Sequence, residues 1–120
     1  VAFLHDSNAL IALRDRDADL LIVVVDNRGG GIFEFLPQAG AVARSEFELL
    51  FGTPHDVDFR SLVEAHGIPL TEIGALDDLT AAIAEKGVRV ALVRTDRQVN
   101  VEVHQRLNAA VSDALDAGVR

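Results

Sequence analysis

The residues best suited to chemistry form a short polar loop directly after the most apolar segment of the chain. Residues 20–25 read LLIVVV, and residues 26–31 read DNRGGG. Magnesium prefers oxygen ligands in octahedral geometry, and proteins usually hold it with a few oxygens together with phosphate groups. The side-chain amide of Asn27 and the main-chain carbonyl of Gly29 are therefore candidate ligands for such a cation.

The same loop also has a purely structural interpretation. A glycine-rich turn after a strand can be no more than a tight connection, because glycine adopts backbone angles that other residues avoid. Two known phosphate-binding patterns are absent from the loop, since no G-x-G-x-x-G opens a helix here and no G-K-S/T follows. From these residues alone, a cation site and a simple turn both remain open.

The elements expected around the loop alternate between strands and helices. Strand 20–25 shows no polar alternation, which is typical of a strand covered on both faces in a parallel sheet. Further strands are predicted at 68–73 and 88–93, and helices are predicted within 3–13, after a cap at Asp58, within 76–83, and after a cap at Asn100. This order predicts an α/β fold with a parallel sheet flanked by helices, whose ligands bind at the carboxyl ends of the strands.

One long segment lacks a clear pattern. Residues 37–51 begin at a proline and show neither helical nor strand periodicity, so we expect a long surface excursion there. The glycines at the ends of the predicted helices, Gly67 and Gly87, are expected to stop them.

Composition limits the possible functions. The chain has 120 residues, is 49% hydrophobic and contains no cysteine, which predicts one core-forming domain or part of one. A formal net charge of −8 disfavours nucleic acid and anionic membrane as partners. No apolar run approaches the roughly 20 residues that span a bilayer, so we expect a cytoplasmic location. Because the chain starts at Val1 within an apolar stretch, we interpret it as a fragment of a longer polypeptide.

Several motifs together resemble one enzyme family. They are FLHDSN at 3–8, DNRGGGIF at 26–33, FGTPH at 51–55, and TDR at 95–97 followed by Asn100. In combination they are similar to the 2-succinyl-5-enolpyruvyl-6-hydroxy-3-cyclohexene-1-carboxylate synthase (MenD) family of thiamine-diphosphate-dependent enzymes. The resemblance covers most of the chain and implies that residues 1–120 are the C-terminal part of the diphosphate-binding domain.

The resemblance implies a set of cofactor contacts. Such enzymes carry a Gly-Asp pair, which in this family immediately precedes the segment that begins here at Val1. The missing aspartate, the Asn27 side chain and the Gly29 carbonyl would bind Mg²⁺, which bridges to the diphosphate of the cofactor. The implied cofactor-binding residues of this chain are Val1, Ala2, Asn27, Gly29, Gly30 and Ile32.

The resemblance also implies a reaction and its substrates. It is the decarboxylation of 2-oxoglutarate and the addition of the resulting four-carbon unit to isochorismate, a transferase step of menaquinone biosynthesis. Ile32, Phe33 and Leu36 would lie beside the acceptor substrate, although Phe33 and Ile32 could instead be core residues. No catalytic residue is expected in this segment, so the isolated fragment should be inactive, and the intact enzyme should be a homodimer or a larger homo-oligomer.

The remaining polar residues are given structural interpretations. His5 and Asp6 are expected to cap or pack in the first helical turn, and Arg28 to face solvent or a neighbouring subunit. His55 is either a solvated loop residue or directed toward the active site. His66 and His104 are expected on helix surfaces.

Two alternatives to the proposed reaction stay open at this point. One is another thiamine-diphosphate decarboxylase or carboligase, such as an acetolactate synthase or a pyruvate decarboxylase. It would share the loop but not the motifs at 51–55 and 95–100. The other is a non-catalytic α/β binding module whose glycine loop holds no metal.

Overall fold

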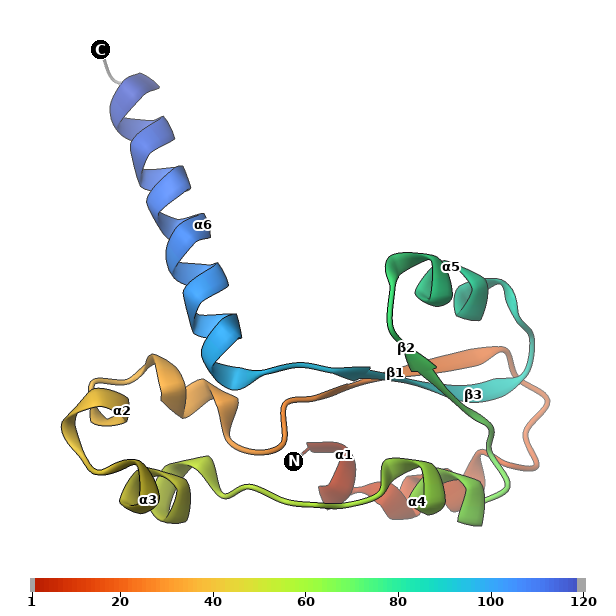
Figure 1. Ribbon diagram of the computed structural model, residues 1–120. Helices are drawn as coiled ribbons and strands as arrows, with labels where there is room; N and C mark the ends of the chain where they lie inside the picture. Colours follow the sequence, from red (N-terminus) through yellow and green to blue (C-terminus); the bar gives the residue numbers. More distant parts are fainter. Residues whose placement is uncertain (1, 119–120) are drawn as a thin grey trace. The chain divides into compact units, whose positions relative to one another are not determined.

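The computed structural model describes residues 2–118 and divides the chain into two compact units (Figure 1). The first, here called the sheet unit, combines residues 1–26 and 55–94. The second, here called the helical unit, combines residues 27–54 and 95–120. Each unit is therefore built from two segments that are far apart in the sequence.

The sheet unit contains a three-stranded parallel sheet. Its strands are β1 (Leu20–Asp26), β2 (Leu70–Ile73) and β3 (Val88–Arg94), in the order β1-β3-β2. In the register of β1 and β3, Val24 lies opposite Leu92. Parallel neighbours joined through helical crossovers confirm the expected α/β fold class.

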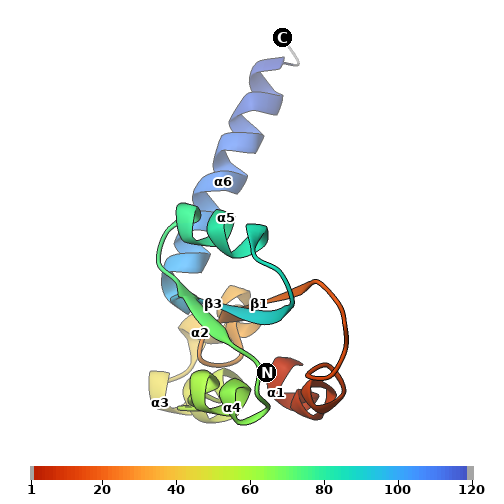
Figure 2. The ribbon, with the colours of Figure 1, turned by 90° about the vertical axis from the view of Figure 1, so that its right-hand side faces the viewer.

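Helices cover both faces of this sheet. On one side lie α1 (Ala2–His5), the 3₁₀ helix η1 (Ser7–Ala12) and α4 (Phe59–Ala65), and on the other side lies α5 (Leu76–Ala84), as Figures 1 and 2 show. The main core forms against α1, η1 and α4. Its buried residues are Leu10, Val24, Phe59, Val63, Ile68, Leu70, Val90 and Leu92.

Local sequence signals account for the helix ends in the sheet unit. Asp58 caps α4 as predicted, because its Oδ1 accepts a hydrogen bond from the amide of Ser61 at 3.2 Å. Gly67 then ends the helix with a positive φ of 72°, a conformation that favours glycine. Asp78 Oδ2 accepts from the amides of Gly74 and Ala75 and so fixes the start of α5.

The sequence-based expectations for the strands need two corrections. Strand β1 is not covered on both faces, since Val23 and Val25 are 46% and 62% exposed. It lies at the edge of the sheet, and the strand with four consecutive buried residues is the central one, β3. Strand β2 begins at Leu70 rather than at residue 68, because Pro69 has no N–H to donate to a ladder.

The first predicted helix is also interrupted. After α1 the chain leaves the α conformation at Asp6, whose φ and ψ are −127° and 35°, and continues as the 3₁₀ helix η1. Asp6 makes no side-chain capping hydrogen bond there. Leu10 of η1 still reaches the core, so the expected apolar face is kept although the helix is not continuous.

The helical unit consists of short helices and one long one. They are η2 (Gly31–Phe35), α2 (Gln38–Ala41), α3 (Arg44–Phe47), the π-helix η3 (Glu48–Gly52) and α6 (Arg97–Gly118). The segment 37–51 lies mainly at the surface, as expected, but it forms short helices rather than an irregular excursion. Phe47 is completely buried, and its ring contacts that of Phe51 with 5.6 Å between the centroids. This contact packs together helices that are too short to show a helical period in the sequence.

Helix α6 starts earlier than predicted. Asp96 Oδ1 accepts hydrogen bonds from the amides of Gln98 and Val99 at 2.8 and 2.9 Å, so the cap is Asp96 and not Asn100. No residue of α6 is buried, and its apolar side chains Val99, Leu107, Val111 and Leu115 are exposed. Within residues 2–118, no helix combines the length and apolar character needed to cross a membrane.

Candidate functional site

The glycine loop, residues 27–31, is a tight turn held by main-chain and side-chain hydrogen bonds. Asn27 Oδ1 accepts from the amide of Gly29 at 3.2 Å, and the carbonyl of Gly29 accepts from the amide of Gly31 at 3.1 Å. Arg28 and Gly29 have φ values of 56° and 152°, angles that residues with side chains rarely adopt. The sequence DNRGGG therefore produces a specific conformation rather than a flexible link.

Two of the glycines are required because other groups approach them closely. A Cβ on Gly29 would collide with the carbonyl oxygen of Gly52, and a Cβ on Gly30 would collide with the carbonyl oxygen of Phe51. The amide of Gly30 donates to the same Gly52 carbonyl at 2.7 Å. The glycine loop is thus pressed against the last residue of η3.

The loop supplies two neutral oxygen donors. A carbonyl or amide oxygen has two lone pairs, and Asn27 Oδ1 and the Gly29 carbonyl each accept one loop amide, so each keeps capacity for another partner. No group of three or more His, Cys, Asp or Glu side chains is arranged to hold a metal within residues 2–118. A hard cation bound at the loop would therefore need further oxygen ligands from elsewhere, which suits a magnesium phosphate complex.

A cavity of about 200 Å³ lies beside the loop within the helical unit. Its walls come from the glycine loop, from α3 and from the start of α6. The lining residues are Asn27, Arg28, Arg44, Thr95, Asp96, Arg97 and Gln98. Asn27, predicted as a ligand, and Arg28, predicted to face solvent, therefore share one concave surface.

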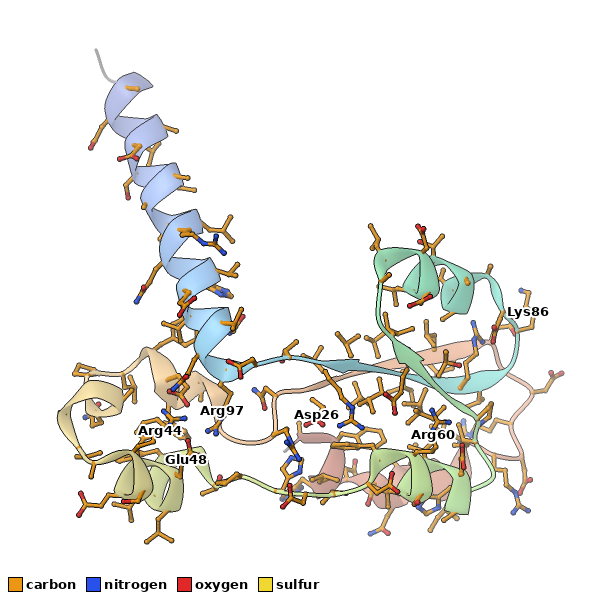
Figure 3. All side chains as sticks on the ribbon, viewed as in Figure 1. Asp26, Arg44, Glu48, Arg60, Lys86 and Arg97 are labelled. Carbon is orange, nitrogen blue, oxygen red and sulfur yellow. The ribbon has the colours of Figure 1, made fainter. Side chains whose placement is uncertain are left out.

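An ion-pair cluster that the sequence analysis missed stands next to this cavity. It consists of Glu34, Arg44, Glu48 and Arg97, here called the four-charge cluster; Figure 3 labels three of its members, Arg44, Glu48 and Arg97. Arg44 donates to both carboxylate oxygens of Glu34 at 2.8 and 2.9 Å, and this pair of hydrogen bonds lowers the pKa of Glu34. Arg97 Nη2 donates to Glu48 at 2.7 Å. The only signal in the sequence was a single charged residue, Glu34, inside the apolar segment 32–36.

The predicted acceptor-side residues follow the glycine loop directly. Ile32 is 73% exposed and Leu36 is 42% exposed, so neither is a core residue of the described chain. Phe33 is 37% exposed and packs one face of its ring toward Phe51, with 5.9 Å between centroids. Phe33 therefore combines partial packing with an accessible apolar surface.

The structure gives Ala2 and the histidines varied environments. Val1 lies outside the described residues, and Ala2 is exposed in α1. His55 is half-buried and packs on Phe59, and its Nδ1 has no hydrogen-bond partner among residues 2–118. His104 is exposed as expected and contacts the Phe35 ring, whereas His66 is half-buried rather than fully on the surface.

Comparison with known protein families bears on the two interpretations of this loop. Residues 1–103 match the family described as thiamine pyrophosphate enzyme, C-terminal TPP binding domain. The chain belongs to this family. Thiamine pyrophosphate, which is thiamine diphosphate, is the cofactor of these domains and binds together with a divalent metal, typically Mg²⁺. Membership therefore favours a cofactor loop over a simple turn.

The chain of this TPP-binding family is also similar to curated relatives along nearly its whole length. It is 44% identical over 117 residues to a 2-succinyl-5-enolpyruvyl-6-hydroxy-3-cyclohexene-1-carboxylate synthase of Saccharopolyspora erythraea, an alignment covering 96% of the chain and 21% of the relative. It is 43% identical over 123 residues to the synthase of Chloroflexus aurantiacus, covering 99% and 21%. The synthase of Thermobifida fusca is 40% identical over 116 residues, covering 96% and 20%. The chain thus spans about a fifth of the length of these relatives.

The described residues of this TPP-binding domain suit the cofactor's metal–diphosphate end. Two hard oxygen donors, Asn27 Oδ1 and the Gly29 carbonyl, lie on one tight turn whose glycines leave no room for side chains. Neutral oxygens bind the cation without adding negative charge that would repel an anionic diphosphate bound to it. These two residues fit the ligand positions that the sequence analysis assigned to them.

Proposed function

We propose that this chain is the metal-binding part of the diphosphate-binding domain of a longer MenD-type enzyme. In that enzyme the Asn27 side chain and the Gly29 carbonyl are ligands of Mg²⁺, and Val1, Ala2, Gly30 and Ile32 contact thiamine diphosphate. The observation that carries the proposal is the oxygen-donor turn directly after β1, in a chain 44% identical over nearly its whole length to one such synthase. The reaction is the decarboxylation of 2-oxoglutarate followed by addition to isochorismate.

The contribution of this chain to catalysis is positional. When bound, the cofactor supplies the electron sink for decarboxylation and carbon–carbon bond formation. Asn27 and Gly29 hold the metal at a fixed place because their turn is closed by three hydrogen bonds and by contact with Gly52. Fixed ligands reduce the cost of orienting the cofactor relative to its substrates. The carboxylate that completes the metal site, and the groups that move protons, are contributed by other segments of the longer polypeptide.

The apolar residues after the glycine loop form part of the acceptor pocket. Ile32, Phe33 and Leu36 are partly or largely exposed in this chain, although large apolar side chains are usually buried. A substrate ring laid on these side chains would cover them and exclude water from the reacting carbon. Their exposure therefore supports an acceptor-binding role over a core role.

Other aspects of the proposal concern the assembled enzyme. A homodimer or larger homo-oligomer is proposed, because cofactors of this class lie between two subunits in the family that the sequence resembles. The cytoplasmic location and the absence of nucleic-acid and membrane partners remain predictions from composition. The substrates distinguish the proposed enzyme from other carboligases that use thiamine diphosphate.

The test uses the full-length polypeptide that contains this chain. Magnesium binding in the presence of thiamine diphosphate is measured by calorimetric titration for the parent enzyme and for Asn27→Ala. Loss of one oxygen ligand should weaken magnesium binding by at least about tenfold, because water replaces the ligand without preorganisation. Asn27→Asp, which keeps an oxygen at the position, should lose less.

A matched control and a substrate comparison complete the test. Asn108→Ala removes an exposed amide from α6 and should leave magnesium binding unchanged. Carbon dioxide release is then compared for 2-oxoglutarate and pyruvate, with isochorismate as acceptor. Turnover of pyruvate but not of 2-oxoglutarate would assign the enzyme to an acetolactate synthase or a pyruvate decarboxylase. Unchanged magnesium affinity in Asn27→Ala would remove the metal from this loop.

A further inference from the structure

Arg97, the first residue of α6, contacts both sides of the turn that contains the candidate metal ligands. Its Cγ lies 3.5 Å from the position that a Cβ on Gly31 would occupy. Its Nη1 lies 2.6 Å from the position of a Cβ on Gly52. The side chain of Arg97 therefore runs from the end of the glycine loop to the last residue of η3, all within the helical unit.

Gly52 is itself a direct neighbour of the glycine loop. Its carbonyl accepts the hydrogen bond from the amide of Gly30 at 2.7 Å, and the same oxygen occupies the space beside Gly29. A displacement of Gly52 would therefore also move Gly29, whose carbonyl is the candidate ligand. Arg97 and the glycine loop are therefore both direct neighbours of Gly52.

The four-charge cluster holds Arg97 in this place. Nη2 of Arg97 donates to Glu48 Oε2 at 2.7 Å, and Nη1 lies 3.4 Å from Glu34 Oε1. Arg44 pairs with both glutamates and so closes the cluster. The side chain of Arg97 is only 12% exposed, which limits the number of positions that its guanidinium can take.

The Nη1 atom of Arg97 is poorly satisfied as a hydrogen-bond donor. It is buried and makes no hydrogen bond of good geometry among residues 2–118, although Oε1 of Glu34 lies 3.4 Å away. Such a group calls for an explanation in a native structure. The same Nη1 atom lies against Gly52, so the ion pairs hold the guanidinium beside this glycine even though one of its donors lacks a complete hydrogen bond.

We propose that Arg97 is a positioning residue for the metal-binding turn. Held by Glu48 and Glu34, its side chain keeps Gly52 against the glycine loop and fixes Gly31 at the end of the loop, so that the oxygens of Asn27 and Gly29 stay oriented when no metal is bound. The inference rests on the proposed function, in which these two oxygens bind Mg²⁺. Arg97 acts through the loop and touches neither the cofactor nor the substrates.

The test compares two arginines of the same cluster in the full-length enzyme. Arg97→Ala removes the side chain that lies beside Gly31 and Gly52, whereas Arg44→Ala removes an ion-pair partner that is not among the atoms nearest to these glycines. Magnesium affinity is measured by calorimetry at saturating thiamine diphosphate. Groups that orient metal ligands typically change affinity by about 10–100-fold, so Arg97→Ala should weaken magnesium binding about tenfold and Arg44→Ala less than about threefold. Arg97→Lys, which keeps the aliphatic stem and a charge, should be intermediate.

A second measurement separates positioning from general stability. Amide hydrogen exchange of residues 29–31 in the metal-free protein should accelerate in Arg97→Ala more than in Arg44→Ala, while both variants lower the melting temperature similarly. If Arg97→Ala does not fold, Arg97→Lys and Arg44→Lys are compared by the same two measurements.

The possible outcomes distinguish this inference from the function on which it rests. If Asn27→Ala weakens magnesium binding but Arg97→Ala does not, the metal site stands and the positioning role is wrong. Equal losses in Arg97→Ala and Arg44→Ala would also overturn it, since they would report the stability of the cluster. If Asn27→Ala itself has no effect, the metal site is elsewhere and the positioning role falls with it.

Discussion

Arg44 and Glu34 form a two-pronged ion pair across ten residues of the helical unit. Nη1 of Arg44 donates to Oε2 of Glu34 at 2.9 Å, and Nη2 donates to Oε1 at 2.8 Å. The Glu34 side chain is 4% exposed, whereas that of Arg44 is 42% exposed. A nearly buried carboxylate thus depends on a partner that reaches it from the surface, and the hydrogen bonds from that partner hold its pKa below the ordinary value of 4.5.

The lowered pKa of Glu34 predicts a pH-dependent contribution to stability. A carboxyl group with a depressed pKa in the folded state stabilises the fold fully above its unfolded pKa, and this contribution is lost as pH falls through the folded value. Glu34→Gln should therefore lower the free energy of unfolding by about 1–3 kcal/mol at pH 7. The difference from the parent protein should shrink below about pH 4.5.

Urea denaturation of both proteins from pH 7 down to about pH 3, below the unfolded pKa of a glutamate, measures this difference. Glu46→Gln, an exposed glutamate on the same short helix as Arg44, is the control and should have little effect at any pH. A constant gap between Glu34→Gln and the parent protein across the whole range would contradict the ionised pair.

Two glycines of the helical unit should respond differently to the same substitution. Gly29 has φ 152°, and a Cβ there would collide with the carbonyl of Gly52, so Gly29→Ala should distort the glycine loop and weaken magnesium binding at least about tenfold. A Cβ on Gly40 in α2 would meet no other atom within 4 Å, and Gly40→Ala should be neutral or slightly stabilising. Calorimetric titration and thermal denaturation compare the two. Equal metal affinity in both variants would mean that the loop conformation is not needed for binding.

Phe33 is predicted to act on the addition step rather than on decarboxylation. An apolar ring can hold the acceptor and exclude water, but it offers no proton and no hydrogen bond to the donor. Phe33→Ala in the full-length enzyme should reduce addition to isochorismate more than carbon dioxide release from 2-oxoglutarate, with more succinic semialdehyde formed as a side product. The two steps are assayed separately.

The control for Phe33 is its neighbour Phe35. Phe35 is 46% exposed and packs on His104 instead of Phe51, so Phe35→Ala should not change the ratio of the two rates. A proportional fall of both rates in Phe33→Ala, with a sharp loss of melting temperature, would make Phe33 a packing residue.

Arg89 is predicted to be structural only. Its side chain is 9% exposed and donates to the carbonyl of Ala82 through Nε and Nη2 at 3.0 and 2.9 Å, and to the carbonyl of Gly87 at 2.6 Å. Arg89→Met keeps volume but removes both guanidinium donors from the Ala82 carbonyl, whereas the Gly87 carbonyl still accepts from the amide of Leu20. The free energy of unfolding should fall by about 1–3 kcal/mol. Chemical denaturation measures the loss, and Arg106→Met on exposed α6 is the neutral control. Magnesium affinity should not change, so a specific loss of metal binding would refute the assignment.

Patterns of residues close together in the sequence predicted several structural elements of this protein. The apolar run at 20–25 was recognisable as a strand because β-branched residues without alternation suit a sheet, and Asp58 was recognisable as a cap because its carboxylate reaches the third following amide. The glycine loop was equally visible, since polar residues and glycines directly after a strand need no distant partner to mark a turn. Because the strand, the cap and the loop each depend on residues that are neighbours in the chain, a single sequence is sufficient to predict them.

Only the tertiary structure decided which residues from distant segments meet. Glu34, Glu48 and Arg97 are separated by up to 63 positions, and no periodicity links them, so their ion pairs exist only once the helical unit has closed. The same holds for Gly52, whose importance comes from its carbonyl being placed beside Gly29. Val23 and Val25 looked like interior residues, yet only the opposite face of β1, which carries Val24, is buried. Burial and charge pairing depend on neighbours that the fold brings together, whereas turns and caps depend on neighbours along the chain.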